Sequence, residues 1–304
     1  MKKQRILSKE ERKEQRLASA LLSPTILLFT VFIVLPGFYM LYLSLQNLNY
    51  AKPYRNGFVG LQNYVEMLHD AAFWNGLNVS AKWVVAEILL QLVCGMALAL
   101  LLNQKIKGRG FFRAISFAPW AVSGTLTTML WTLIYSQHIG VLNMILKALG
   151  LIGSEGIAWL GNEKTVFGAV VIAELWRGIP FFAINFLAGL QSIPQNIYEA
   201  GAMDGCGRFQ SFWKLTLPFL KETIVMTILL RTIWTFNSFD MLYTMTGGGP
   251  FRLTTTLPIY TYQVTFASGE FGYGSALAVT STLILLVFAA VFMKAMRYGG
   301  NVDE

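Results

Sequence analysis

Six apolar stretches, each long enough to cross a lipid bilayer, dominate this sequence of 304 residues. A helix needs about 20 mostly apolar residues to cross the hydrocarbon core of a membrane. The sequence therefore predicts an all-α integral membrane protein with six transmembrane helices. The expected spans are Leu17–Leu45, Val79–Asn103, Phe112–Tyr135, Thr165–Leu190, Glu222–Met245 and Gly274–Met296.

The composition agrees with a membrane location. Hydrophobic residues make up 55% of the chain and charged residues 13%, against about 25% charged residues in a soluble domain. The first apolar stretch is too long for a signal peptide and contains Pro24 and Pro36, so we expect it to be a retained span. The fifth stretch contains Arg231, Asn237 and Asp240, and would make a poor lipid-facing helix by itself.

The positions of lysine and arginine predict the orientation. With the N-terminus inside, inner segments carry 16 of the 24 basic residues and outer segments carry 6. Because basic residues are enriched on the cytoplasmic side, we expect both termini to be cytoplasmic. The chain then divides into a basic cytoplasmic tail (residues 1–16), a transmembrane domain (17–296) and a second cytoplasmic tail (297–304). On the outer side, apolar residues at helical spacing from Leu61 to Leu68 predict a short helix.

A polar loop at about residues 191–221 lies on the predicted cytoplasmic side. Its residues from Gln195 to Met203 favour a helix, which Asp204-Gly205 would end because glycine tolerates the left-handed conformation found there. A second short helix is expected from near Gly207 onward. The sequence therefore predicts a bent element of two short helices rather than an extended connection.

This bent element is a candidate docking surface for a partner protein. Glu199 could pair with a cation of the partner, and the small residues beside it allow close approach. The alternative is an ordinary polar connection, which explains the charges but not why about 30 residues stay compact and helix-prone. The candidate docking residues are Glu199, Ala200, Gly201, Asp204, Gly205, Phe212, Leu217 and Pro218.

Several kinds of chemistry are not expected. The sequence has no GxxxxGK[ST] motif for phosphate binding, so we expect neither a nucleotide site nor catalysis by the chain itself. The two histidines and two cysteines lie in separate segments, which predicts no metal centre and no disulfide. The net charge of +8 is explained by basic residues that flank the spans, and no nucleic-acid partner is expected.

The loop resembles a known motif. Glu199-Ala200-Gly201, Asp204-Gly205, Phe212 and Leu217-Pro218 are similar to the EAA loop of ATP-binding-cassette (ABC) importer permeases, with Gly201 in place of a common alanine. Four flanking segments resemble the sugar-uptake branch of that family, the relatives of the maltose permease subunits. These segments are residues 58–64, 176–181, 188–194 and 247–250.

The resemblance implies a pore subunit driven by a separate ATPase. In such importers the loop forms a coupling helix in a cleft of a cytoplasmic ATPase dimer, and closure of that dimer on ATP rocks the pore. The implied partners are this ATPase, a second permease subunit that is a different, related chain, an extracytoplasmic binding protein that delivers a sugar or oligosaccharide, and the lipid bilayer. The chain itself would bind no cofactor, and it would lie in a prokaryotic plasma (inner) membrane.

Polar residues within the fourth and fifth spans are candidates for solute binding, because buried polar groups in membranes usually face a cavity or a partner. Glu174 and Arg177 share a helix face. The alternative is an intrahelical Glu174–Arg177 ion pair, with Asn237 and Asp240 holding helices together. The expected solute-binding residues are Gly178, Phe181, Asn237, Asp240 and Tyr243.

Other functions stay open on the sequence alone. Arg177 could attract an anionic solute, such as an acidic sugar or a polyol phosphate. An ion-coupled secondary transporter of a small polar solute would use the intramembrane charges as a relay, but such proteins usually have more spans and an inverted repeat. A membrane enzyme would need convergent catalytic groups, which the sequence does not suggest. The identity of the solute and the choice between a homodimer and a heterodimer also stay open.

Overall fold

The computed structural model describes residues 9–50, 52–104 and 107–297, so most of the expected C-terminal tail and the first half of the expected N-terminal tail lie outside the described residues. The chain forms two compact units. One contains the chain up to Met67 together with Val264–Thr280, and the other contains Leu68–Gln263 together with the chain from Ser281 onward.

Four of the six expected spans are helices long and apolar enough to cross a membrane. These stretches are Ser19–Ser44, Ala71–Asn103, Val166–Ser192 and Phe271–Met296. The first stretch joins α1 (Lys9–Phe29), a π-helical turn η1 (Thr30–Val34) and α2 (Leu35–Ser44). The second is α4 (Ala71–Asn103), which begins eight residues before the expected Val79 because the Asp70 carboxylate caps the amide of Ala72 at 2.8 Å.

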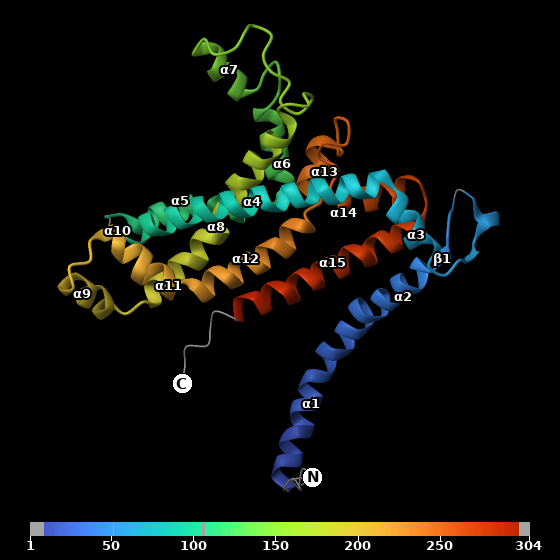
Figure 1. Ribbon diagram of the computed structural model, residues 1–304, viewed down its shortest axis with the longest axis horizontal. Helices are drawn as coiled ribbons and strands as arrows, with labels where there is room; N and C mark the ends of the chain where they lie inside the picture. The colour runs from blue at the N-terminus through green and yellow to red at the C-terminus, as the bar shows by residue number, and fades with distance from the viewer. Residues whose placement is uncertain (1–8, 51, 105–106, 298–304) are drawn as a thin grey trace. The chain divides into compact units, whose positions relative to one another are not determined.

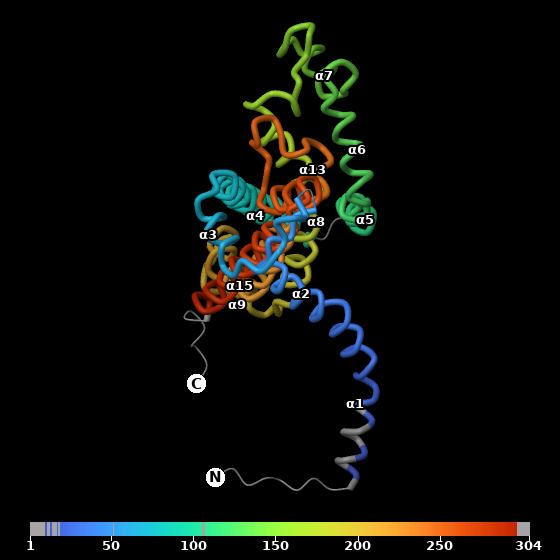
Figure 2. Tube along the Cα trace, turned by 90° about the vertical axis from the view of Figure 1, so that its right-hand side faces the viewer, coloured from blue at the N-terminus to red at the C-terminus, as the bar shows by residue number. Residues whose placement is uncertain are grey.

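The third expected span is two helices instead of one. It contains α5 (Arg109–Ala121) and α6 (Gly124–Ile134). Val122 is extended between them, and the Ser123 hydroxyl accepts a hydrogen bond from the Leu126 amide at 3.3 Å to start the second helix. Figures 1 and 2 both show α6 leading away from α5 toward α7 (Val141–Ala148).

The fifth expected span is also interrupted. It contains α12 (Lys221–Phe236) and α13 (Asp240–Thr246). Asn237, one of the polar residues that made this span a poor lipid-facing helix, is the C-cap of α12. Broken helices at membrane depth are tolerated where protein or a water-filled cavity surrounds the exposed backbone. Two of the six expected transmembrane helices are therefore each formed by a pair of shorter helices.

Among the residues that the structure describes, the only β-strands lie in the first unit. Strands β1 (Gln46–Asn47) and β2 (Gly57–Phe58) form an antiparallel hairpin, with Gln46 opposite Phe58 and a 3₁₀ turn η2 (Pro53–Arg55) between them. The predicted outer helix is confirmed as α3 (Gln62–His69). The buried Asn63 amide donates to the carbonyls of Ser44 and Gln46 at 2.8 and 2.9 Å, and so fixes α3 to the hairpin.

The second unit is built on close packing of α4 against α8 (Val166–Ser192), with α12 beside both (Figure 1). Two glycines allow this approach. A Cβ atom on Gly95 would lie 2.4 Å from Cβ of Phe182, and one on Gly178 would lie 2.2 Å from the Gln91 amide nitrogen. Small residues at contacts between membrane helices let the backbones approach in this way. After α13 the chain continues through α14 (Leu257–Tyr262) of the second unit, and then through π-helical η4 (Gln263–Ala267) to α15 (Phe271–Arg297), of which Val264–Thr280 belong to the first unit.

The segment around α7 contains a buried polar side chain, Asn143, which is 1% exposed. Its amide nitrogen donates to the carbonyls of Ser136, Gln137 and Ile157. Its amide oxygen accepts from the Ile157 backbone and from the Trp159 indole at 3.2 and 3.0 Å. A single polar side chain thus ties α7 to the segments before and after it, beside the packing of Leu142, Trp159 and Leu160 against the apolar core.

We expect Asn143→Ala to loosen this segment selectively, because each buried group left without a partner costs about 1–3 kcal/mol. Hydrogen–deuterium exchange of the purified protein should show faster exchange at residues 136–159 and unchanged exchange in α4 and α8. Asn162→Ala is the matched control, since the exposed Asn162 side chain bonds only the nearby Lys164 amide. Equal effects of the two substitutions would contradict the role of Asn143.

Candidate functional site

The predicted two-helix loop is present, and its first helix is confirmed as α9 (Gln195–Met203). Gly205 has φ of +78°, in the left-handed region that favours glycine. The amide of Cys206 bonds the carbonyl of Gly201 at 2.9 Å, and the amide of Gly205 bonds the carbonyl of Ala202 at 3.1 Å. This pair of bonds is the Schellman motif, which ends a helix and satisfies its last carbonyls.

The second arm of the loop is also helical. It runs through α10 (Arg208–Ser211), the π-helical turn η3 (Phe212–Thr216) and α11 (Leu217–Phe219), which places Pro218 in the first turn of α11. Two contacts hold the arms together. A Cβ atom on the buried Gly201 would lie 2.7 Å from the Leu215 side chain, and the Tyr198 hydroxyl lies 3.1 Å from the hydroxyl of Thr216.

The outer surface of this element contains most of the candidate docking residues. Glu199, Ala200, Asp204, Gly205 and Pro218 are exposed, while Gly201 is buried. Phe212 and Leu217 are half-buried. Large apolar side chains also lie exposed nearby, with Met203 at 90% and Phe209 at 77%. A pre-formed surface with acidic and apolar groups is suited to docking, although Met203 was not singled out from the sequence.

Four polar side chains form a buried network across α4, α8 and α12. The Arg231 guanidinium donates to the Gln91 amide oxygen at 2.8 Å and to the Glu174 carboxylate at 2.9 Å. The Gln91 amide nitrogen donates to the Glu87 carboxylate at 2.6 Å. All four residues are at most 5% exposed. Charges in such surroundings need partners, because removing one partner leaves an uncompensated buried charge.

This network changes the interpretation of the intramembrane charges. The Glu174–Arg177 pair is present but long, at 3.8 Å, and the Arg177 side chain is 29% exposed. The shorter ion pair joins Glu174 to Arg231 on another helix. Glu87 and Gln91 were missed from the sequence, although two polar residues four apart in an apolar span are a recognisable signal.

Two of the candidate solute-binding residues lie at this network. Gly178 makes room for Gln91, as its backbone leaves no space for a side chain there. The Phe181 ring lies 5.9 Å from the Arg231 guanidinium and 5.1 Å from the exposed Trp234 ring. Both candidates are themselves buried.

The other three candidates lie elsewhere in the same unit. Tyr243 stacks on Phe239 at 4.7 Å, and Tyr262 closes this aromatic cluster at 5.0 Å from Tyr243. Asn237 and Asp240 are exposed, and the Asn237 amide bonds the Ile233 carbonyl of its own helix. Among the residues that the structure describes, no hydrogen bond or ring contact joins these three to Gly178 or Phe181.

Comparison with known families and proteins gives one consistent result. Residues 91–298 match the family described as "binding-protein-dependent transport system inner membrane component". The trehalose/maltose transport system permease protein MalF of Thermococcus litoralis is 36% identical over 96% of this chain and 98% of its own length. The sulfoquinovosyl glycerol transport system permease protein SmoG of Agrobacterium fabrum is 34% identical over 93% of this chain and 91% of its own.

A solved structure has the same fold. It is a bacterial alginate ABC transporter in complex with an alginate pentasaccharide-bound periplasmic protein. One of its chains superposes with a TM-score of 0.84 at 20% identity, covering 97% of this chain and 99% of that one. The similarity of fold therefore extends over almost the whole chain.

We expect Arg231→Met to lower the free energy of unfolding by about 3–5 kcal/mol, because it leaves a buried carboxylate without its cation. Arg177→Met is the matched control. It should change the free energy of unfolding by only about 0–1 kcal/mol, because the Glu174–Arg177 pair is long and partly exposed. Denaturant unfolding of the protein in lipid nanodiscs would measure both. A larger loss for Arg177→Met would show that the intrahelical pair dominates, contrary to the geometry.

Proposed function

Because the chain belongs to the family of binding-protein-dependent transport system inner membrane components, we propose that it is the membrane-spanning permease subunit of an ABC importer for a sugar or oligosaccharide. The observation that carries the sugar assignment is the 36% identity to a trehalose/maltose permease over 96% of the chain. Another relative, 35% identical over 83% of this chain, is a diacetylchitobiose permease. The protein is located in the inner membrane of a prokaryotic cell.

The bent element α9–α11 is the proposed docking surface for the ATPase. Its Schellman turn at Gly205 and its Gly201–Leu215 contact fix the shape of the element before any partner binds. Pre-organisation of this kind lowers the entropic cost of association. Glu199 and Asp204 offer exposed negative charge, and Met203 and Phe209 offer apolar area. The ATP would be used by the ATPase, and this chain would supply no cofactor site.

The proposed topology has six membrane crossings with both termini in the cytoplasm. Four crossings are the long apolar helices, and the other two are the interrupted pairs α5–α6 and α12–α13. The bias of basic residues supports this orientation, since 16 of 24 fall on the proposed inner side. The docking element then lies in the cytoplasm.

The proposed solute path follows the aromatic residues of the fourth and fifth crossings. Sugars present apolar C–H faces and rims of hydroxyl groups, which suit rings beside polar side chains. One such place is Phe181 with Trp234, and another is the cluster of Tyr243, Phe239 and Tyr262. Asn237 and Asp240, exposed at the break between α12 and α13, would supply hydrogen bonds.

An acidic sugar or a polyol phosphate is the second candidate solute. The observation that favours it is the partial exposure of Arg177, whose guanidinium is only weakly compensated by Glu174 at 3.8 Å. The proposed partners are the same for either solute. They are a second permease subunit that is a different, related chain, an ATP-binding-cassette ATPase dimer and an extracytoplasmic binding protein.

We expect Glu199→Ala to reduce solute-stimulated ATP hydrolysis by the reconstituted complex about tenfold or more, as a lost interface contact of about 1.4 kcal/mol or more would do. Gly205→Pro should reduce it further, because the ring of proline cannot adopt a positive φ. The assay contains the ATPase, the partner permease, the binding protein and a panel of neutral and acidic sugars.

Glu163→Ala is the control for a lost exposed carboxylate, and should leave the stimulation unchanged. Full stimulation of ATP hydrolysis in both loop variants would contradict the proposal that this loop couples the ATPase to the permease. Uptake by this chain without any ATPase would instead indicate an ion-coupled secondary transporter.

A further inference from the structure

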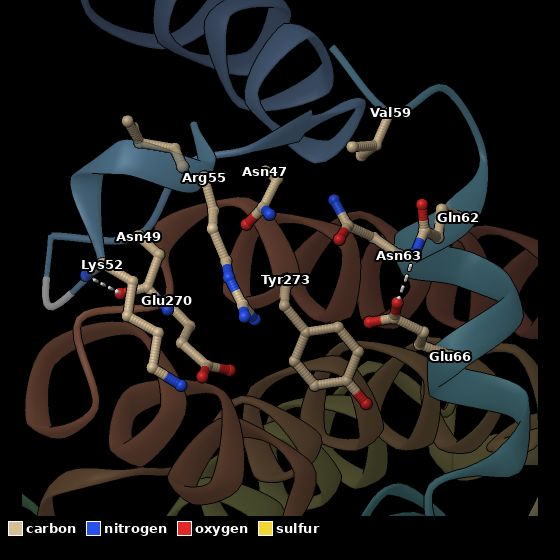
Figure 3. Close-up of a pocket in the computed structure, with 11 residues that line it drawn as sticks. Asn47, Asn49, Lys52, Arg55, Val59, Gln62, Asn63, Glu66, Glu270 and Tyr273 are labelled. Atoms are coloured by element: carbon tan, nitrogen blue, oxygen red, sulfur yellow. Dashed lines mark hydrogen bonds between the residues drawn. The ribbon is translucent and has the colours of Figure 1, made fainter. Parts of the chain in front are cut away.

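The first unit contains a polar pocket of about 270 Å³ that the proposed transport path does not use. It opens between the loop of the β1–β2 hairpin, the start of α3 and the N-terminal end of α15. Figure 3 shows side chains from all three segments pointing into one space. The volume is just below the about 300–1,000 Å³ of pockets for drug-sized ligands, so it suits one small ligand.

The walls of this pocket are fixed by backbone bonds. The Tyr50 amide bonds the Gly269 carbonyl at 2.9 Å, and the Gly272 amide bonds the Leu48 carbonyl at 3.1 Å. A Cβ atom on Gly272 would lie 2.0 Å from the Gln46 carbonyl oxygen, so only glycine permits this approach. The pocket is therefore part of the fold of this unit and does not depend on side chains closing over it.

The hairpin loop is folded so that two cations face the pocket. The Asn56 amide oxygen accepts from the Asn49 backbone at 2.8 Å, and the Asn49 amide oxygen accepts from the Lys52 backbone at 3.0 Å. These bonds turn the loop back on itself. Lys52 and Arg55, which lie within it, both line the pocket.

Two carboxylates balance these cations. Glu66 on α3 and Glu270 before α15 line the same pocket, and Figure 3 shows the Arg55 guanidinium pointing toward Glu270 and Tyr273. Within the described part of the chain, no ion pair joins Lys52 or Arg55 to either carboxylate. The pocket therefore carries no net formal charge, yet it offers both charged donors and charged acceptors.

This combination favours an uncharged ligand that is rich in hydroxyl groups. Each hydroxyl both donates and accepts, and hydrogen bonds to charged groups are stronger than those between neutral groups. A carboxylate or phosphate would be attracted by Lys52 and Arg55 but repelled by Glu66 and Glu270. The half-buried Tyr273 ring adds an apolar surface of the kind that a sugar ring can cover.

We propose that this pocket binds one neutral sugar residue, as a saccharide site separate from the transport path. The proposal rests on the proposed function in one respect, since a sugar importer of the proposed topology would expose this unit to extracytoplasmic saccharide. Its specificity follows from the balanced charges of the pocket. An uncharged monosaccharide unit should therefore bind more tightly than its uronic acid.

The test uses the full complex in lipid nanodiscs, without ATP and without the binding protein. Equilibrium binding of glucose, maltose, trehalose and glucuronate is measured for wild type and for Arg55→Ala with Glu270→Ala. This double variant removes one charge of each sign, and we expect it to weaken maltose or trehalose binding at least tenfold. Lys164→Ala with Glu163→Ala is the matched control outside the pocket, and should bind like wild type.

A second variant distinguishes a loss of saccharide binding from misfolding of the double variant. Glu66→Gln keeps the shape of an exposed side chain, and should weaken binding severalfold with no change in melting temperature. Unchanged saccharide binding in both pocket variants would overturn the proposal. Glucuronate binding that is as tight as, or tighter than, glucose binding would overturn it as well.

The experiments test the importer proposal and the pocket proposal independently. If Glu199→Ala abolishes sugar-stimulated ATP hydrolysis but neither pocket variant changes saccharide binding, the importer proposal stands and the pocket proposal falls. If the pocket variants lose saccharide binding but no sugar stimulates ATP hydrolysis in wild type, the pocket proposal stands and the importer proposal falls.

Discussion

The buried contact of Arg231 with Glu174 and Gln91 is the interaction on which the second unit depends. It joins three helices, α4, α8 and α12, at a depth where water cannot replace a missing partner. It also explains the nearby glycine, since Gly178 leaves the room that Gln91 occupies. Two of the joined helices lead directly to the proposed docking element, because α8 ends at Ser192 before α9 and α12 begins at Lys221 after α11. A force applied to α9 would therefore enter two helices that the network already holds together, as rigid-body coupling requires.

The docking element and the pocket of the first unit share a principle of construction. In both, glycine allows a backbone approach that any side chain would prevent, at Gly201 against Leu215 and at Gly272 against the Gln46 carbonyl. Hydrogen bonds then fix the resulting bend, so the exposed side chains are presented by a rigid backbone. This arrangement gives each surface a defined shape before its proposed ligand arrives, which lowers the entropic cost of binding.

Local signals in the sequence predicted the local structure well. The extent of α9 and the turn at Gly205 follow from helix propensity and from the tolerance of glycine for positive φ, and both are confirmed. The breaks at Val122–Ser123 and at Asn237 were not predicted, because hydropathy averages over a window and does not register a single capping residue. The partners of Arg231 could not be predicted from the sequence either, since Gln91 and Arg231 are 140 residues apart and only tertiary packing brings them together. The polar pocket depends in the same way on residues from both ends of its unit.

The proposed role of α9 and its neighbours is to form the surface on which an ATPase docks. Hydrogen–deuterium exchange of the complex, with and without the ATPase subunits, tests this claim most directly. We expect the ATPase to slow exchange at residues 195–211, with the largest effect around Glu199, and to leave exchange in the α7 segment unchanged. Unchanged exchange at residues 195–211, with protection appearing elsewhere in the chain, would contradict it.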